Sequence, residues 1–216
     1  MTARVILLAA ALAPVMVAGP AQELVAQGNA LWRAKRHPEA VAVYQKALAL
    51  RPDSPEATYD LGVALYRMGD FTRALENFDR AARLARRGRI ASLSRYNAGN
   101  SAFQQGLSLA YSDPRGALSL MEHALASYRE AQRLDAGLRD ASLNSEVVRK
   151  WLKLLEKHFA EQQGRGAASG PPATGAGDAL QNILGRDRGK RSGAGSRSRS
   201  LASCSPMASS NRSPRT

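Results

Sequence analysis

The sequence predicts an all-α protein in which short antiparallel helical hairpins stack on one another and end in a C-terminal capping helix. Alanine and leucine, which are strong helix formers, dominate the 216 residues. Small and aromatic residues recur with a period of about 34 residues, the length of one two-helix repeat. Proline and glycine interrupt the helical pattern at intervals that suit the turns between short helices.

Residues 1–21 have the layout of a secretory signal peptide. A short positive segment ends at Arg4, and an apolar run covers Val5–Ala18. Small residues follow, which predicts cleavage after Ala21. The apolar run is short for a membrane helix, which needs about 20 apolar residues, and an uncleaved anchor is the alternative. Either way we expect an exported protein, periplasmic or associated with the inner membrane and facing the periplasm.

The first two repeats cover about 21–54 and 55–88, and their characteristic residues superpose without a gap. We expect the shared glycines and alanines where the two helices of a hairpin press together, since no larger side chain fits there. The shared aromatic residues fill the space between consecutive hairpins. The superposed pairs are Gly28 with Gly62, Leu31 with Leu65, Ala40 with Ala74, Tyr44 with Phe78, and Ala47 with Ala81.

A third repeat over about 92–138 is longer than the others. Gly99 stands at the packing glycine and Tyr128 at the aromatic position, with about 13 extra residues between its two halves. Proline after a capping residue at 112–114 predicts a helix start, so both helices are lengthened and turn near there; a loop without structure is the alternative. The capping helix follows over about 139–163, with Leu143 among its predicted buried residues.

Residues 164–216 form a basic tail rich in Gly, Ser and Arg. This composition buries too little apolar surface to offset the entropy of the chain, so we expect disorder. Asp178–Leu184 is a short amphipathic segment, either a docking motif or a chance cluster. A serine/arginine tract covers 196–200, and the lone Cys204 rules out an intramolecular disulfide.

The repeat residues over about 21–140 resemble the tetratricopeptide repeat (TPR) family. The resemblance implies a short right-handed superhelix whose first helices line a concave groove, and a non-catalytic scaffold that binds another protein there. Aromatic and arginine side chains are common anchors of such interfaces, although Tyr66 and Phe103 could equally pack against the next repeat. The implied groove residues are Asn29, Trp32, Arg33, Tyr59, Asp60, Tyr66, Arg67, Tyr96, Asn97, Asn100 and Phe103.

One TPR subclass holds the C-terminal carboxylate of chaperones with two lysines, two asparagines and an arginine. Only Asn29 matches that set here, since Val25, Asp60, Leu93 and Asn97 occupy the other positions. We therefore do not expect binding to chaperone tails.

A narrower resemblance rests on the segments Tyr96–Asn100 and Asp140–Arg149 behind a signal peptide. In these segments the sequence is similar to the exported TPR proteins of bacterial Bacteroides-aerotolerance-type operons. That family is associated with von Willebrand factor A-domain membrane proteins and a MoxR-type ATPase. The resemblance implies a von Willebrand factor A-domain membrane protein as the partner. The lengthened third hairpin and the Arg/Ser tail depart from the pattern of that family.

The net charge of +13 leaves other partners open. Arginines cluster near the junction of the second and third repeats, as either a solvated face or a dock for an acidic protein or phospholipid headgroups. The alternative function is therefore an anionic-membrane or nucleic-acid binder acting through Arg186–Arg199 of the tail. Nucleic acid is not the expected partner, and the N-terminus or a partner could provide membrane association. This basic patch comprises Arg80, Arg83, Arg86, Arg87, Arg89 and Arg95.

The sequence names no residue for catalysis. His37, His123 and His158 are far apart, and no Cys/His cluster has the spacing of metal ligands. Glu56 and Asp60 would share one helix face, but no His or Cys stands beside them in the repeat. Glycine-rich phosphate loops are also missing from the sequence. We predict no enzyme activity, no cofactor and no metal site.

Overall fold

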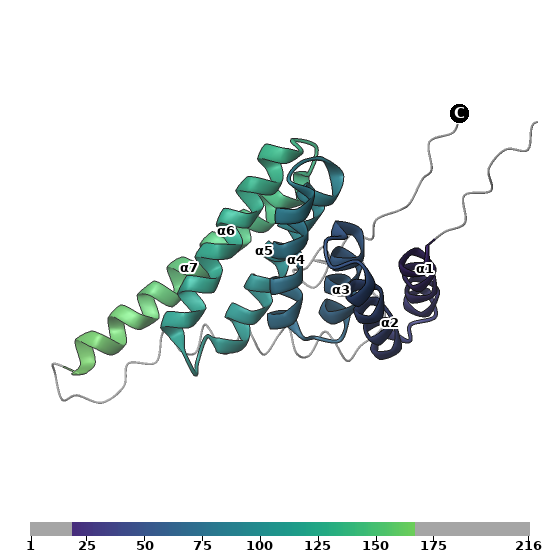
Figure 1. The fold of residues 1–216 in the computed structure, drawn as a ribbon. Coiled ribbons are helices and arrows are strands. Elements are labelled where there is room, and N and C mark those ends of the chain that lie inside the picture. Colours follow the sequence, from purple (N-terminus) through teal and green to yellow (C-terminus); the bar gives the residue numbers. More distant parts are fainter. Residues whose placement is uncertain (1–18, 167–216) are drawn as a thin grey trace, which may run out of the picture.

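The computed structural model describes residues 19–166, with side chains described to residue 161 (Figure 1). Residues 1–18 and 167–216 hold most of the predicted signal peptide and of the predicted tail, including 178–184 and Cys204, and lie outside the described residues. The described part is all helical: α1 (Pro20–Arg33), α2 (His37–Leu50), α3 (Pro55–Arg67), α4 (Phe71–Ala85), α5 (Gly88–Leu109), α6 (Pro114–Leu134) and α7 (Arg139–Gly166).

The helices form three hairpins followed by one further helix. Helix α1 packs on α2, α3 on α4 and α5 on α6, while α2 meets α3, α4 meets α5 and α6 meets α7. Figure 1 shows the resulting row, with α1 at one end and α7 at the other. The all-α class and the stack of helical hairpins predicted from the sequence are confirmed.

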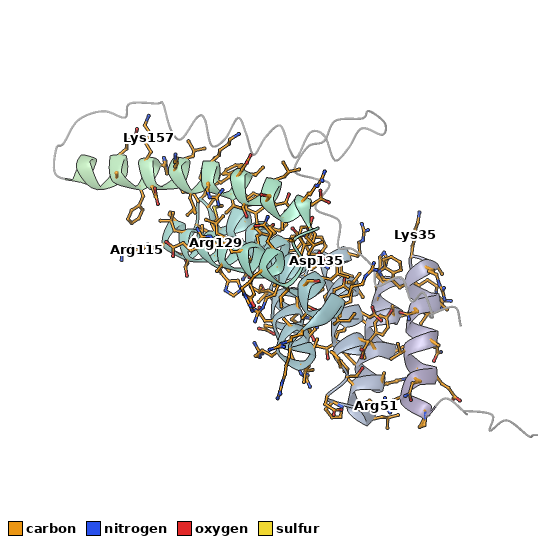
Figure 2. All side chains as sticks on the ribbon, turned by 90° about the horizontal axis from the view of Figure 1, so that it is seen from above. Lys35, Arg51, Arg115, Arg129, Asp135 and Lys157 are labelled. Atoms are coloured by element: carbon orange, nitrogen blue, oxygen red, sulfur yellow. The ribbon has the colours of Figure 1, made fainter. Side chains whose placement is uncertain are left out.

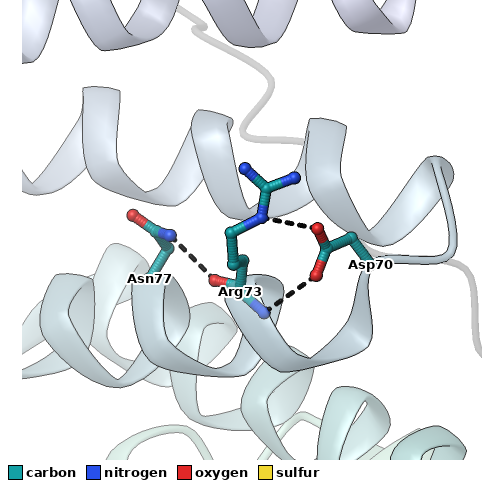
Figure 3. Close-up of polar contacts among 3 residues, drawn as sticks. All are labelled: Asp70, Arg73 and Asn77. Carbon is teal, nitrogen blue, oxygen red and sulfur yellow. Dashed lines mark hydrogen bonds and ion pairs between the residues drawn. The ribbon is translucent and has the colours of Figure 1, made fainter.

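Short polar side chains start three of the helices. Ser54 Oγ accepts the Ala57 N–H at 3.2 Å, and Asp113 Oδ1 accepts the Gly116 N–H at 2.9 Å. Asp70 accepts the Arg73 N–H at 3.1 Å and also receives the Arg73 Nε at 2.5 Å (Figure 3). Such caps satisfy backbone donors that the first helical turn leaves unpaired.

In each hairpin an aromatic ring of the second helix lies against a glycine of the first. A Cβ atom added to the glycine would lie 2.5, 2.9 or 2.6 Å from the nearest ring carbon, too close for any other residue without a shift. The rings are almost fully buried. The three pairs, in chain order, are Gly28 with Tyr44, Gly62 with Phe78, and Gly99 with Tyr128.

The third hairpin is the longest part of the stack. Helices α5 and α6 have 22 and 21 residues, against 14 in each helix of the first hairpin. The added turns remain packed, because Gly106 lets α5 approach the Ala117 carbonyl and the Met121 side chain of α6. Helix α5 begins at Gly88, four residues before the predicted repeat boundary at 92. Gly88 has a positive φ of 79°, which turns the chain into the helix.

Helix α7 covers α6 with one face. Val148, Trp151 and Leu155 are buried in the core, and Arg115 of α6 lies 5.5 Å from the Phe159 ring centroid, in cation–π range. Leu143 is 55% exposed, so the prediction that it belongs to the buried face is wrong. The small residues Ala141 and Ser145 are buried instead, which puts Leu143 on the opposite side of the helix.

Replacing Gly99 by alanine should destabilise the protein by about 1–3 kcal/mol, because the new Cβ meets the Tyr128 ring in a full core. Helix propensity alone predicts the opposite, a gain of up to about 1 kcal/mol. Urea unfolding of the full chain measures the difference. A Gly99→Ala protein as stable as the wild type would contradict this packing account.

Candidate functional site

The first helix of each hairpin, together with α7, forms one side of the stack, which we call the odd-helix face. Helices α1 and α3 contact each other, as do α3 and α5. Helix α7 reaches α5 through Asn144, whose Nδ2 donates to Tyr96 Oη at 3.2 Å and to Asn100 Oδ1 at 3.1 Å. The sequence-predicted groove residues all belong to α1, α3 or α5.

A tyrosine–asparagine hydrogen bond recurs between successive helices of this face. Asn97 Nδ2 of α5 donates to Tyr59 Oη of α3 at 2.9 Å, and Asn144 of α7 bonds Tyr96 of α5 in the same way. Both tyrosines stand three residues before a packing glycine, and Asn97 stands two before. Asn144 thus gives α7 the position of a first helix in a further hairpin.

Glu146 occupies the packing-glycine position of α7 under this alignment, and it is exposed. No second helix presses on α7 within the described residues. Position 146 of α7 therefore has no aromatic ring packed against it among the described residues, and a residue larger than glycine fits there.

A second hydrogen bond lies inside the hairpins and depends on the aromatic residue. Tyr44 Oη donates to Asn29 Oδ1 at 2.6 Å, and Tyr128 Oη donates to Asn100 Oδ1 at 2.8 Å. Each asparagine directly follows a packing glycine. In the second hairpin the ring is Phe78, which has no hydroxyl, and the residue after the glycine is the apolar Val63.

These bonds join into one buried network over α3, α5, α6 and α7. Asn100 Nδ2 donates to Asn97 Oδ1 at 3.3 Å, and the side chains of both asparagines are fully buried. Burial, followed by the charge of Asp60, raises the pKa of the Tyr59 hydroxyl above its ordinary value. Amide groups suit this place because each can donate and accept at once.

The network changes how the predicted groove must be described. Its third-repeat residues, together with Tyr59, lie inside the protein with at most 3% exposure, which differs from the prediction that they line an open surface. Hydrogen bonds to neighbouring helices hold the polar ones, and Phe103 belongs to the core cluster. These five residues are Tyr59, Tyr96, Asn97, Asn100 and Phe103.

The other predicted groove residues lie on α1 and α3 and are partly or fully exposed. Tyr66 packs edge-on against Phe71 with ring centroids 5.2 Å apart, while the Trp32 ring lies 6.3 Å from His37. Burial, then the positive charges of Arg67 and Lys35, lowers the pKa of His37. This part of the odd-helix face is open; its predicted residues are Asn29, Trp32, Arg33, Asp60, Tyr66 and Arg67.

Two atoms near this open part lack hydrogen-bond partners within the described residues. They are the Trp32 indole Nε1 and the His37 Nδ1, and both are shielded from solvent. Buried polar atoms are nearly always paired. The Trp32 indole N–H beside His37 is therefore a donor that the described residues leave unsatisfied.

The predicted basic patch divides into two parts. Arg80 donates to the Pro52 carbonyl at 2.5 Å, and Arg95 bonds Asp79 Oδ1 at 2.8 Å, so these two hold hairpins together. Asp79 also receives His123 Nε2 at 3.3 Å. The remaining four arginines are exposed and have no ion pair within residues 19–161: Arg83, Arg86, Arg87 and Arg89.

Neither a metal centre nor a membrane span is formed by the part of the chain that the structure describes. No three His, Cys, Asp or Glu side chains gather there as metal ligands, and none of its helices is long and apolar enough to cross a bilayer.

Comparison with known families agrees with the geometry of the first two hairpins. A family model described as "TPR repeat" matches residues 28–69, and one described as "Tetratricopeptide repeat" matches residues 55–87. Residues 28–87 therefore match models of the tetratricopeptide repeat. Proteins built of such TPRs are generally non-catalytic scaffolds that bind other proteins.

Solved structures with similar folds include other TPR domains. The first TPR of Spaghetti (RPAP3) bound to an HSP90 peptide is 20% identical with a TM-score of 0.52, covering 62% of this chain and 93% of that chain. At this identity the likeness establishes the fold alone. No curated protein sequence matches the chain.

Two further similar structures have lower TM-scores. The Sgt2 TPR domain from Aspergillus fumigatus is 19% identical (TM-score 0.49; 72% of this chain, 87% of that chain). A T3SS complex from Aeromonas hydrophila is 17% identical (TM-score 0.46; 65% and 83%).

The pairing of tyrosine with asparagine can be tested by copying the apolar pair of the second TPR into the third hairpin. Asn100→Val alone should cost about 1–3 kcal/mol, because it removes the acceptor of the buried Tyr128 hydroxyl and one of the two acceptors of the Asn144 amide. Tyr128→Phe alone should cost about 0.5–1.5 kcal/mol. The double variant should lose less than the sum, with a coupling of about 1 kcal/mol in urea unfolding.

The matched control is the same cycle at Tyr44 and Asn29, where Asn29 is only half-buried and water can replace the lost partner. Its coupling should be smaller. Additive losses in the third hairpin would contradict the account of a shared buried network.

The stability of the protein should depend on pH through His123. Its hydrogen bond to Asp79 raises the His123 pKa, while burial and Arg95 oppose the rise. A group whose pKa is higher in the folded state stabilises the fold below its unfolded pKa of about 6.5 and loses that effect as pH rises through the folded pKa. The wild type should therefore have a larger free energy of unfolding at about pH 5.5 than at about pH 8, and His123→Gln should reduce this difference. An unchanged difference would exclude the His123–Asp79 pair as the cause of the pH dependence.

Proposed function

We propose that this chain is a non-catalytic scaffold of the bacterial cell envelope that binds a segment of another protein on the open part of the odd-helix face. The observation that carries the proposal is the contrast along this face. On α5, Asn97 and Asn100 are buried and hydrogen-bonded to other side chains of the network. On α1 and α3, by contrast, aromatic, cationic and amide groups remain accessible. Recognition therefore belongs at the first two TPRs.

The chemistry of the open part suits an extended peptide. Trp32 and Tyr66 offer aromatic surface, and Arg33 and Arg67 offer cations with no ion pair among the described residues. Asn29 uses its Oδ1 for Tyr44, which leaves its amide N–H groups for a peptide carbonyl. Anchors of this kind with a few oriented donors are typical of protein interfaces.

The proposed location and partner rest on the sequence. The signal-peptide layout of residues 1–21 supports export to the periplasm. The resemblance to aerotolerance-type operon proteins supports a von Willebrand factor A-domain membrane protein as the partner. A chaperone tail is not proposed, although the similar Spaghetti domain is bound to an HSP90 peptide, because Val25 and Asp60 replace clamp residues here.

The full chain should recover a specific protein from bacterial envelope extract, and Trp32→Ala with Arg67→Glu should reduce recovery at least about tenfold, since both anchors are lost. Arg51→Glu is the control: Arg51 lies past the end of α2, opposite the Lys35 turn (Figure 2). A photo-crosslinking amino acid at position 33 should label the same protein, and one at position 51 should not. Equal recovery by all three proteins would reject the proposed surface.

A further inference from the structure

A second candidate site lies at the other end of the odd-helix face. A cavity of about 430 Å³ opens between the start of α5 and the link from α6 to α7, the link marked by Asp135 in Figure 2. This volume is within the range of about 300–1,000 Å³ that is typical of ligand pockets. We call it the elbow cavity; its lining includes Arg89, Ser92, Leu93, Leu134, Asp135 and Leu138.

The lining combines apolar walls with a cationic rim. The leucines come from α5, from the last turn of α6 and from the link to α7, and Arg89 stands exposed at the start of α5. Asp135 is the acidic member of the lining, and its Oδ1 accepts the Gly137 N–H at 2.9 Å. That bond engages the carboxylate in the turn between α6 and α7.

Arg89 lines the cavity, and three further arginines without ion pairs among residues 19–161 precede it closely in the chain. Arg83 lies in the last turn of α4, and Arg86 and Arg87 form the link to Gly88, another residue of the cavity lining. Their neighbours Arg80 and Arg95 have protein partners, but these three and Arg89 find no carboxylate at ion-pair distance among residues 19–161. Four like charges within residues 83–89 repel one another, and an acidic partner would relieve this repulsion.

The backbone of this link is strained at an arginine. Arg86 has φ 56° and ψ −47°, and the Arg87 N–H bonds the Ala85 carbonyl at 2.6 Å. This is a γ-turn with positive φ, a rare conformation for any residue with a side chain. Glycine would adopt it more easily, and glycine does stand at the next positive φ, Gly88. An arginine kept at a strained position is consistent with a role for its side chain.

We propose that the elbow cavity binds an acidic segment of a partner protein that carries one apolar side chain among Asp and Glu residues. The apolar side chain enters between Leu93, Leu134 and Leu138, while the flanking carboxylates pair with the arginines of the rim. Such pairs are strong because the guanidinium can donate two parallel hydrogen bonds to a carboxylate.

Lipid headgroups and nucleic acid fit the same surface less well. Both would bring phosphates to the arginines, but neither uses a concave pocket of leucines. Single strands bind where bases can stack on aromatic rings, and the cavity lining has none. The charge favours any anion, and the cavity favours one that carries an apolar side chain.

The elbow site goes beyond the groove proposed above, because it uses different helices. Arg89 is nevertheless near enough to Tyr59 for its charge to lower the pKa of that buried hydroxyl, against the larger effect of burial. The elbow therefore borders the buried network rather than the open surface of α1. A scaffold with both sites could hold two segments at once.

The test uses the full chain and a set of fluorescein-labelled acidic peptides with a central Leu, Ile, Phe or Met, each matched by a peptide with central Ala. Fluorescence anisotropy should show binding of at least one apolar peptide about tenfold tighter than its alanine match, as expected for burial of one side chain. Binding should weaken with rising salt. Absence of binding across the set, or equal binding of matched peptides, would overturn the proposal.

Variants separate the cavity from charge in general. Arg86→Glu with Arg89→Glu should weaken the apolar peptides at least about tenfold, because two favourable pairs become repulsive. Arg51→Glu with Arg129→Glu, the same charge change at exposed positions away from the cavity (Figure 2), should have little effect. Equal losses in both variants would overturn the site.

Leu134→Trp fills the cavity from a half-buried position and should remove the preference for an apolar residue while the circular dichroism and melting temperature stay close to the wild type. A retained preference would overturn the proposal. The proposal would also be overturned if phosphatidylglycerol vesicles or an oligonucleotide bound more tightly than the peptides, with binding that is lost in the Arg86→Glu, Arg89→Glu variant and unchanged in Leu134→Trp. Trp32→Ala with Arg67→Glu should leave peptide binding unchanged, so failure of the groove and failure of the elbow are distinguishable.

Discussion

A ring set against a glycine holds each hairpin of this protein together. The ring carbons lie where the Cβ of any other residue would stand, so the two helices approach closely and the ring is shielded on all sides. Everything else is arranged around these contacts. They set the distance between the helices, and this distance brings the residue after each glycine level with the end of the ring. Asparagine is present there when the ring carries a hydroxyl, as at Tyr44 and Tyr128, and valine when it does not.

The same contacts divide the odd-helix face into a closed and an open part. Tyr59 and Tyr96, three residues before Gly62 and Gly99, each accept a hydrogen bond from an asparagine on the next helix of the odd-helix face. These bonds connect α3 to α5 and α5 to α7. The residue three before Gly28 is Val25, so the first junction lacks this bond. A buried hydrogen-bond network specifies one arrangement of its helices when every member is satisfied. The first hairpin is joined to the second by apolar packing and by the Arg80–Pro52 hydrogen bond instead, and Arg33 and Arg67 stay exposed there.

The fold could be predicted from the sequence because its determinants are local and repeat. Gly62 and Phe78 predict a hairpin by their spacing alone, and Pro114 after Asp113 predicts the start of α6. The site could be predicted only in part. The position of Asn97 on a first helix follows from the repeat, but its bond to Tyr59, 38 residues earlier, depends on how two hairpins are placed in space. The same limit explains Leu143, which fits a helical stripe as well as Ala141 or Ser145 does; the contact with α6 decides which residues are buried.

The engaged and unengaged polar groups together explain where this scaffold can act. A side chain that completes a buried network cannot serve a partner without breaking that network, which costs about 1–3 kcal/mol for each group left unpaired. Tyr96, Asn97 and Asn100 of α5 are therefore poor contact residues, despite their residue types. Cations such as Arg67 and Arg89 lack partners within the described residues and carry no such cost. Binding at them adds interactions without removing any, which supports the two sites that we propose on the odd-helix face and at the elbow cavity.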